Sequence, residues 1–210
     1  MNNQLKNISL KDYVYEKIKK MIDEGSFSIG EKIDKNELSK LFNISLTPIN
    51  DALNRLVGEK YISVESRKGF YIKEYTDKEL ADLFSLRIGI ESVAVRLCCE
   101  IASDEEIKII SSFFDGIDPY NEKDLEEYKK QDKLFHRKII EFARNTYLND
   151  ILSQTGFLSK SILTGLVRGP EETYKEHMKI IDCLLARDAD GAQKAMTKHL
   201  SRSKVKLIGK

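Results

Sequence analysis

Cysteine is scarce in this 210-residue chain, which contains only Cys98, Cys99 and Cys183. The number is odd and no pair has CxxC spacing, so we expect thiols in a reducing compartment rather than disulfides or a cysteine metal site. An apolar run of about 18 residues, long enough to span a membrane, is absent. The first residues, MNNQLKNISLKDY, also lack an apolar stretch of signal-peptide length. Together these absences predict a cytoplasmic protein that does not bind membranes.

An excess of charge of either sign is also missing, because the net charge is only +1. Residues 1–75 carry 13 Lys and Arg against 11 Asp and Glu, so neither half of the chain is strongly basic. Bulk electrostatics therefore does not predict nucleic-acid binding, and any such prediction must come from local geometry.

Histidine occurs only three times, and each histidine lies in a different helical segment. Asp132 and His136 are four residues apart in DKLFH, which places them within about 6 Å of each other on one face of a helix. His177 and His199 lie on two later segments that a helical bundle could bring to the same point. Asp plus three imidazoles suits a divalent first-row metal. The alternative is that these are isolated, half-exposed histidines without any ligand.

The first 75 residues predict three short helices followed by a β-hairpin. Apolar spacing places the helices at residues 10–24, 35–42 and 46–59, with Pro48 in the first turn of the third. The alternating runs YISVE and FYIKEY flank the turn SRKG, which is typical of a hairpin. The order helix, helix, helix, hairpin is that of a winged helix-turn-helix, although other small α+β domains share it. In a winged helix the third helix enters the major groove of DNA.

From Asp77 onward the sequence is helical almost throughout. Thr76 and Ser103 are positioned to cap two helices, and Glu106 has capping-box spacing from Ser103. Six or seven helices with short links favour an antiparallel bundle. We therefore expect a mainly α protein with a winged helix-turn-helix domain over residues 1–75 and an all-helical domain over residues 76–210.

Several ordered motifs resemble a known family over roughly residues 10–202. The matching stretches are GEKIDKNELSKLFNISLTPINDALNRLVGEKYISVESRKGFYIKEYT, DLFSLRIGIESVAVRLC, DKLFHRKIIEFARNTYL and EHMKIIDCLLARDADGAQKAMTKHL. The first resembles the winged-helix domain of GntR-type bacterial transcription regulators. The others resemble the helical effector domain of the FadR-like branch, called FCD, and in particular its metal-containing subset.

The resemblance implies a homodimeric transcription regulator, most simply a repressor, that binds an inverted-repeat DNA operator and responds to a small carboxylate effector. Asp132, His136, His177 and His199 fall on the family's metal-binding positions, where zinc is expected and nickel, manganese or iron are alternatives. Arg87 falls on a segment that lines the effector pocket, and its guanidinium suits a carboxylate. Its alternative role is to pair with Glu91, one turn further along the helix.

The resemblance also implies a set of DNA-contacting residues: Asn36, Ser45, Thr47 and Asn50 on the helices, and Arg67, Lys68 and Gly69 at the tip of the wing. Ser45 and Thr47 could instead serve only as helix caps, and Arg67 and Lys68 could form an ordinary solvated turn. The family's usual helix start, SRTPVREAL, reads SLTPINDAL here, so Leu46 and Asn50 replace two arginines. Arginine commonly reads guanine, so the loss of both arginines implies a different operator, weaker binding, or both, and we expect a site less dependent on guanine.

Two other functions use the same metal ligands. A metal-dependent hydrolase would use them to activate water, but no HExxH-like arrangement supplies a general base. A purely structural metal site in a DNA-binding protein is the second alternative. We expect no enzyme activity.

Overall fold

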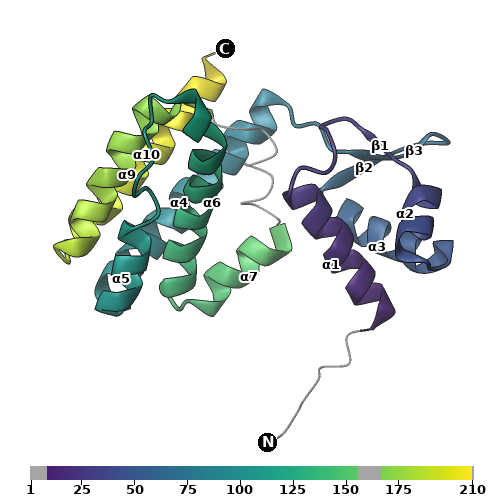
Figure 1. Ribbon diagram of the computed structural model, residues 1–210, viewed down its shortest axis with the longest axis horizontal. Helices are drawn as coiled ribbons and strands as arrows, with labels where there is room; N and C mark the ends of the chain where they lie inside the picture. Colours follow the sequence, from purple (N-terminus) through teal and green to yellow (C-terminus); the bar gives the residue numbers. More distant parts are fainter. Residues whose placement is uncertain (1–8, 156–166, 210) are drawn as a thin grey trace, which may run out of the picture. The chain divides into compact units, whose positions relative to one another are not determined.

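The computed structural model describes residues 9–155 and 167–209, which divide into two compact units, Met1–Glu74 and Tyr75–Lys210 (Figure 1). The predicted fold class is confirmed: a small helical unit with a three-stranded sheet is followed by a helical unit. No helix in the described residues is both long and apolar enough to cross a membrane.

From residue 9 onward, the first unit has three helices and three short strands. Its elements are α1 Leu10–Asp23, β1 Lys32–Ile33, α2 Lys35–Phe42, α3 Leu46–Gly58, β2 Ile62–Glu65 and β3 Gly69–Ile72. The predicted helices and hairpin are present. No strand was predicted between the first two helices, but the end of the connecting segment SFSIGEKI forms β1. This two-residue strand pairs with β3, so the antiparallel sheet has the order β1-β3-β2.

The position of α3 in the first unit is fixed by apolar packing. The apolar residues of α3 at Ile49, Leu53 and Leu56 are fully buried, and α3 packs against α1, which buries Val14 and Ile18. Burial of one such side chain contributes about 1.5–3 kcal/mol. The opposite face of α3 is left at the surface.

The second unit is built around the long helix α4. Its elements are α4 Asp77–Ile101, α5 Asp104–Ser111, the 3₁₀ turn η1 Glu122–Asp124, α6 Leu125–Phe142, α7 Thr146–Thr155, α9 Pro170–Leu185 and α10 Ala189–Ile208. Thr76 and Ser103 cap α4 and α5 as predicted. Both form capping boxes, although only the one at Ser103 was predicted. Helices α10 and α6 both pack against α4, and α10 also packs against α9. Residues 156–166, part of the stretch predicted to be helical, lie outside the described residues.

Candidate metal centre and nucleic-acid interface

One face of α6 carries a row of polar side chains at intervals of four residues: Tyr128, Asp132 and His136. This spacing places them one above another on the helix. Tyr128 and His136 are buried, while Asp132 is partly exposed. His136 Nε2 lies 4.0 Å from Asp132 Oδ1, in agreement with the short separation expected from their spacing.

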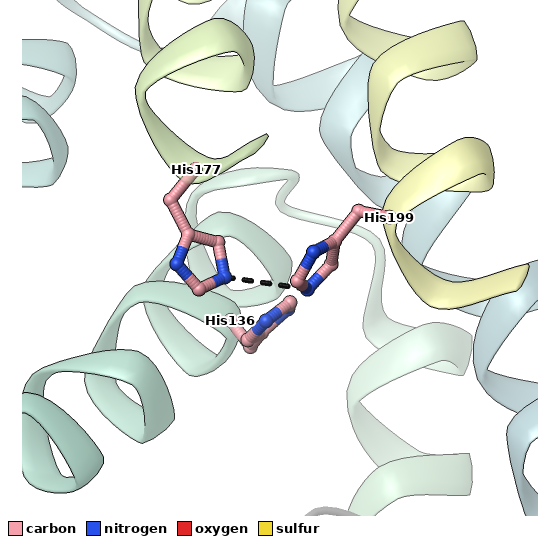
Figure 2. A group of neighbouring side chains, drawn as sticks. All are labelled: His136, His177 and His199. Atoms are coloured by element: carbon pink, nitrogen blue, oxygen red, sulfur yellow. Dashed lines mark hydrogen bonds between the residues drawn. The ribbon is translucent and has the colours of Figure 1, made fainter. Parts of the chain in front are cut away.

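The three histidines come from three helices and point toward one another (Figure 2). His136 lies on α6, His177 on α9 and His199 on α10, and all three are buried. One nitrogen of each ring lies within 4.8 Å of one nitrogen of the other two. His177 Nε2 is 3.3 Å from His199 Nε2 and 3.3 Å from Asp132 Oδ1. The structure therefore brings the four residues together, and none of the three histidines is isolated.

In each of the three rings, Nδ1 is the outer nitrogen, the one that is bonded outside the cluster. The outer nitrogen of His136 is held by a buried ion pair on α4. Nδ1 of His136 lies 2.5 Å from Glu91 Oε2, and Arg87 Nε donates to Glu91 Oε1 at 2.6 Å. Burial alone would raise the pKa of Glu91, but the charge of Arg87 and the hydrogen bond from His136 lower it to about 2. Glu91 is therefore ionised and can only accept, so Nδ1 of His136 carries the hydrogen and Nε2 faces the cluster.

The outer nitrogen of His177 is held by a chain of hydroxyl groups. Thr173 Oγ1 donates to the carbonyl of Gly169 at 3.1 Å, and it lies 2.7 Å from the Tyr128 hydroxyl. If the threonine hydrogen is used for that carbonyl, the tyrosine must donate to the threonine. The Tyr128 oxygen, 3.0 Å from His177 Nδ1, then accepts from it. This directionality leaves the lone pair of His177 on Nε2.

The outer nitrogen of His199 is held by an acidic residue of α9. Nδ1 lies 2.8 Å from Glu176 Oε2, and Arg168 binds both oxygens of that carboxylate, at 3.0 and 2.5 Å. Burial opposes ionisation of Glu176, but hydrogen bonds from His199 and Arg168 lower its pKa to about 2. Arg168 Nη2 also approaches His199 Nδ1, but at 3.4 Å. The shorter contact with the ionised carboxylate sets the tautomer, with the hydrogen on Nδ1.

These contacts fit a metal ion. Metal-ligating histidines generally donate their second N–H to a carboxylate, a carbonyl or another oxygen, which fixes the tautomer and the ring orientation. Ligands about 2.0–2.1 Å from a tetrahedral zinc are separated by about 3.3–3.4 Å, close to the 3.3 Å observed from His177 Nε2 to His199 and Asp132. Without a cation, an unprotonated ring nitrogen would face a carboxylate oxygen at this distance.

The electrostatics of the cluster favour neutral rings, which is the form that binds metals. Burial lowers the pKa of His177 well below its usual value, and the facing His199 and His136 lower it further. Burial also lowers the pKa of His199, although its bond to Glu176 opposes this. At neutral pH these two lone pairs are therefore available to a metal.

Sequence reasoning missed most of the groups that orient the imidazoles. Glu91 was expected only as a partner of Arg87, and Tyr128, Glu176 and Arg168 were not singled out. One signal was available, since Tyr128 continues the four-residue spacing of Asp132 and His136. The contacts to Glu91 and Glu176 join residues on different helices, and no local pattern marks them.

The expected nucleic-acid contacts lie at the surface of the first unit. Asn36 is exposed in the first turn of α2, Ser45 and Thr47 are exposed at the start of α3, and Asn50 is partly exposed one turn later. Ser45 is the N-cap residue of α3, but its side chain makes no capping hydrogen bond. Its hydroxyl therefore does not cap the backbone N–H groups of α3.

The wing tip is a turn with two residues of positive φ. Arg67 has φ of 63° and Gly69 has φ of 117°, where glycine is favoured because it has no Cβ. Arg67 and Lys68 are exposed, and Lys68 pairs with Glu65 at 2.9 Å. The expected wing residues thus lie together at one end of the β2–β3 hairpin.

Comparison with known proteins agrees with this architecture. The FCD domain family matches residues 82–202, which is more than half of the chain, and the bacterial regulatory proteins of the gntR family match residues 10–72. The chain belongs to the GntR family and carries an FCD domain. As a GntR protein with a winged helix-turn-helix, it is a DNA-binding transcriptional regulator and not an enzyme, in agreement with the sequence-based prediction.

Two relatives of this GntR regulator illustrate the similarity. The Nta operon transcriptional regulator of Aminobacter aminovorans is 28% identical over 179 residues, which cover 84% of each chain. The HTH-type transcriptional repressor GlaR of Escherichia coli is 27% identical over 201 residues, covering 89% of this chain and 90% of GlaR. The solved structure of E. coli McbR/YncC shares the fold, with a TM-score of 0.78 and 21% identity over 96% of this chain and 98% of that one.

Proposed function

We propose that this GntR regulator is a cytoplasmic, homodimeric repressor whose operator affinity is controlled by a small carboxylate bound at a metal ion. Residues 1–75 would bind an inverted-repeat operator, and residues 76–210 would bind the effector and dimerise. The assignment as a repressor is supported by its similarity to GlaR, which is named a transcriptional repressor.

The observation that carries the proposal is the arrangement of the three imidazoles. In each ring Nδ1 has an oxygen partner, while His177 Nε2 and His199 Nε2 meet at 3.3 Å. Asp132, His136, His177 and His199 would be the ligands of a divalent first-row metal, with zinc favoured by the nitrogen-rich set and nickel, manganese or iron as alternatives. When bound, the metal would supply a Lewis-acidic position for a carboxylate oxygen.

Arg87 is the residue we assign to the effector carboxylate. Its Nε donates to Glu91 Oε1 at 2.6 Å, and its guanidinium carbon lies 5.0 Å from the centre of the Phe84 ring. A guanidinium can bind a carboxylate through its Nη atoms while Nε keeps a second acceptor. Arg87 is also two hydrogen bonds from His136 through Glu91. Both roles considered for Arg87, effector binding and pairing with Glu91, are therefore compatible.

Helix α4 is the element through which the effector would act. It carries Arg87 and Glu91, and it begins at Asp77, close in sequence to Glu74, where the first unit ends. The effector would change the balance between two dimer arrangements in proportion to its differential affinity for them. The DNA contacts that would respond are Asn36, Ser45, Thr47, Asn50, Arg67, Lys68 and Gly69.

The test is an operator titration monitored by fluorescence anisotropy, with a duplex selected from random DNA and a panel of small carboxylates. We expect at least one carboxylate to weaken binding by the metal-loaded protein and to have no effect after chelation. Arg87→Lys keeps the charge but loses the planar fork, so it should lose the response while retaining the metal. Lys138→Arg, at a partly exposed cation on α6, is the matched control.

A different result would favour a structural metal site. In that case chelation would lower the melting temperature, and no carboxylate would alter operator affinity with or without metal. That outcome would overturn the effector role proposed for Arg87 while leaving the metal ligands in place.

A further inference from the structure

A stripe of uncharged side chains runs along the exposed side of α3. Leu46, Asn50 and Asn54 are spaced by four residues and therefore lie on one face of the helix. Leu46 is 40% exposed although it is a large apolar residue, Asn54 is exposed and Asn50 is partly exposed. The opposite face is buried against the first unit. This stripe is what α3 would present to a DNA groove.

The charged residues of α3 are engaged elsewhere. Arg55 is its single cation, and its guanidinium lies 3.7 Å from the centre of the Tyr15 ring. The same group pairs with Asp12 at 3.2 Å and with Glu59 at 3.4 Å, which directs it toward α1 and the end of α3. Asp51 pairs with Lys11 of α1 at 2.6 Å.

We infer that α3 reads A·T base pairs rather than G·C pairs, an inference that rests on the DNA-binding function. In the major groove, thymine is distinguished by its 5-methyl group, which makes apolar contacts, and adenine by N6 and N7, which an amide side chain can pair with. Leu46 supplies the apolar contact and Asn50 the amide. Guanine is read chiefly by arginine or lysine, and this stripe has neither.

The affinity for phosphate then comes from residues outside α3. Arg67 and Lys68 at the wing tip are exposed cations that neutralise phosphate without reading bases. The first unit therefore divides the two tasks: the wing contributes salt-dependent affinity, and the stripe of Leu46 and Asn50 selects A·T steps.

The test begins with selection of duplexes from random DNA by the metal-loaded full-length protein at low salt. We expect each enriched half-site to carry adenine and thymine at the steps contacted by α3. The selected duplex is then synthesised again with one modified base at a time. Replacing the contacted thymine by uracil should weaken binding about fourfold, the loss expected for one buried methyl group. Replacing the contacted adenine by 7-deazaadenine should weaken it about two- to tenfold.

Amino-acid substitutions then show which side chain is responsible for each loss of binding to the altered duplexes. Leu46→Ala should bind the thymine and uracil duplexes equally, whereas Leu185→Ala should keep the wild-type preference. Leu185 is a matched control because it is also an exposed leucine, 55% exposed at the end of α9 in the other unit. Leu46→Arg together with Asn50→Arg should shift the selected bases toward guanine.

Three outcomes would overturn the inference: enrichment of guanine by the wild-type protein at these steps, no base preference there, or equal binding of the thymine and uracil duplexes. Failure to retain any duplex at low salt would overturn DNA binding itself, and the base preference with it. None of these results depends on a response to carboxylates. The operator titration with carboxylates therefore tests the proposed effector independently of the base preference.

Discussion

Replacing Glu91 by glutamine should destabilise the metal-free protein far more than any surface carboxylate change. Glu91 is 1% exposed and lies between Arg87 and His136, at 2.6 and 2.5 Å. In Glu91→Gln the side-chain volume is nearly unchanged, but Arg87, only 8% exposed, loses its counter-charge. Removal of one partner from a buried ion pair costs about 3–5 kcal/mol. For a chain of this size that corresponds to a fall in melting temperature of roughly 6–20 °C.

The assay is thermal and urea unfolding in the presence of chelator, because a bound metal would add its own stabilisation. Glu141→Gln is the matched control, since Glu141 is half-exposed on α6 and pairs with Lys138 at 2.9 Å. A surface pair of this kind contributes about 0–1 kcal/mol. The double variant Arg87→Met with Glu91→Gln should recover most of the lost stability, because it removes the buried charge as well. Equal effects of the Glu91 and Glu141 changes, or a double variant as unstable as the sum of its parts, would refute the reasoning.

Three further predictions concern pH, hydrogen bonding and the wing. The pKa values of His177 and His199 are lowered by folding, so as the pH falls these histidines are protonated at a higher pH in the unfolded chain than in the folded protein. Urea midpoints of the metal-free protein should therefore fall as pH drops below about 6.5, and His177→Gln should flatten that slope. Tyr128→Phe should weaken zinc binding about tenfold by calorimetry, and unchanged affinity would contradict its orienting role. Gly69→Ala should cost about 1–2 kcal/mol in urea unfolding because φ is 117°, whereas Gly58→Ala in α3 should not destabilise.

The parts of the fold that were predictable from sequence are those that depend on neighbouring residues. Thr76 and Ser103 bond to residues three positions ahead, so their capping boxes and the starts of two helices could be read directly. Strand β1 could not, because a two-residue strand has no periodicity of its own. It forms because Lys32 and Ile33 pair with Tyr71 and Phe70 of β3, nearly forty positions along the chain.

The candidate site follows the same division. The four-residue spacing of Asp132 and His136 predicted their proximity. No local spacing could predict that Glu91, which is 45 positions from His136 in the sequence, lies against it. The Arg87–Glu91 pair was predictable as a helical neighbour, whereas the burial of both side chains follows only from the packing. Local pattern thus indicated the Asp132–His136 pair, the family resemblance added His177 and His199 as candidate ligands, and the tertiary structure supplied the groups that orient the rings.

The most direct test of the account is the tautomeric state and metal response of the three imidazoles. Nitrogen-15 labelling of histidine alone gives a simple spectrum in tag-free protein, because the chain has only three histidines. We predict that Nδ1 carries the hydrogen in all three rings of the metal-free protein at neutral pH. One equivalent of zinc should then shift all three Nε2 resonances together. Zinc that leaves these resonances unchanged, or rings in which Nε2 carries the only hydrogen, would contradict the central claim that this cluster is built to hold a metal.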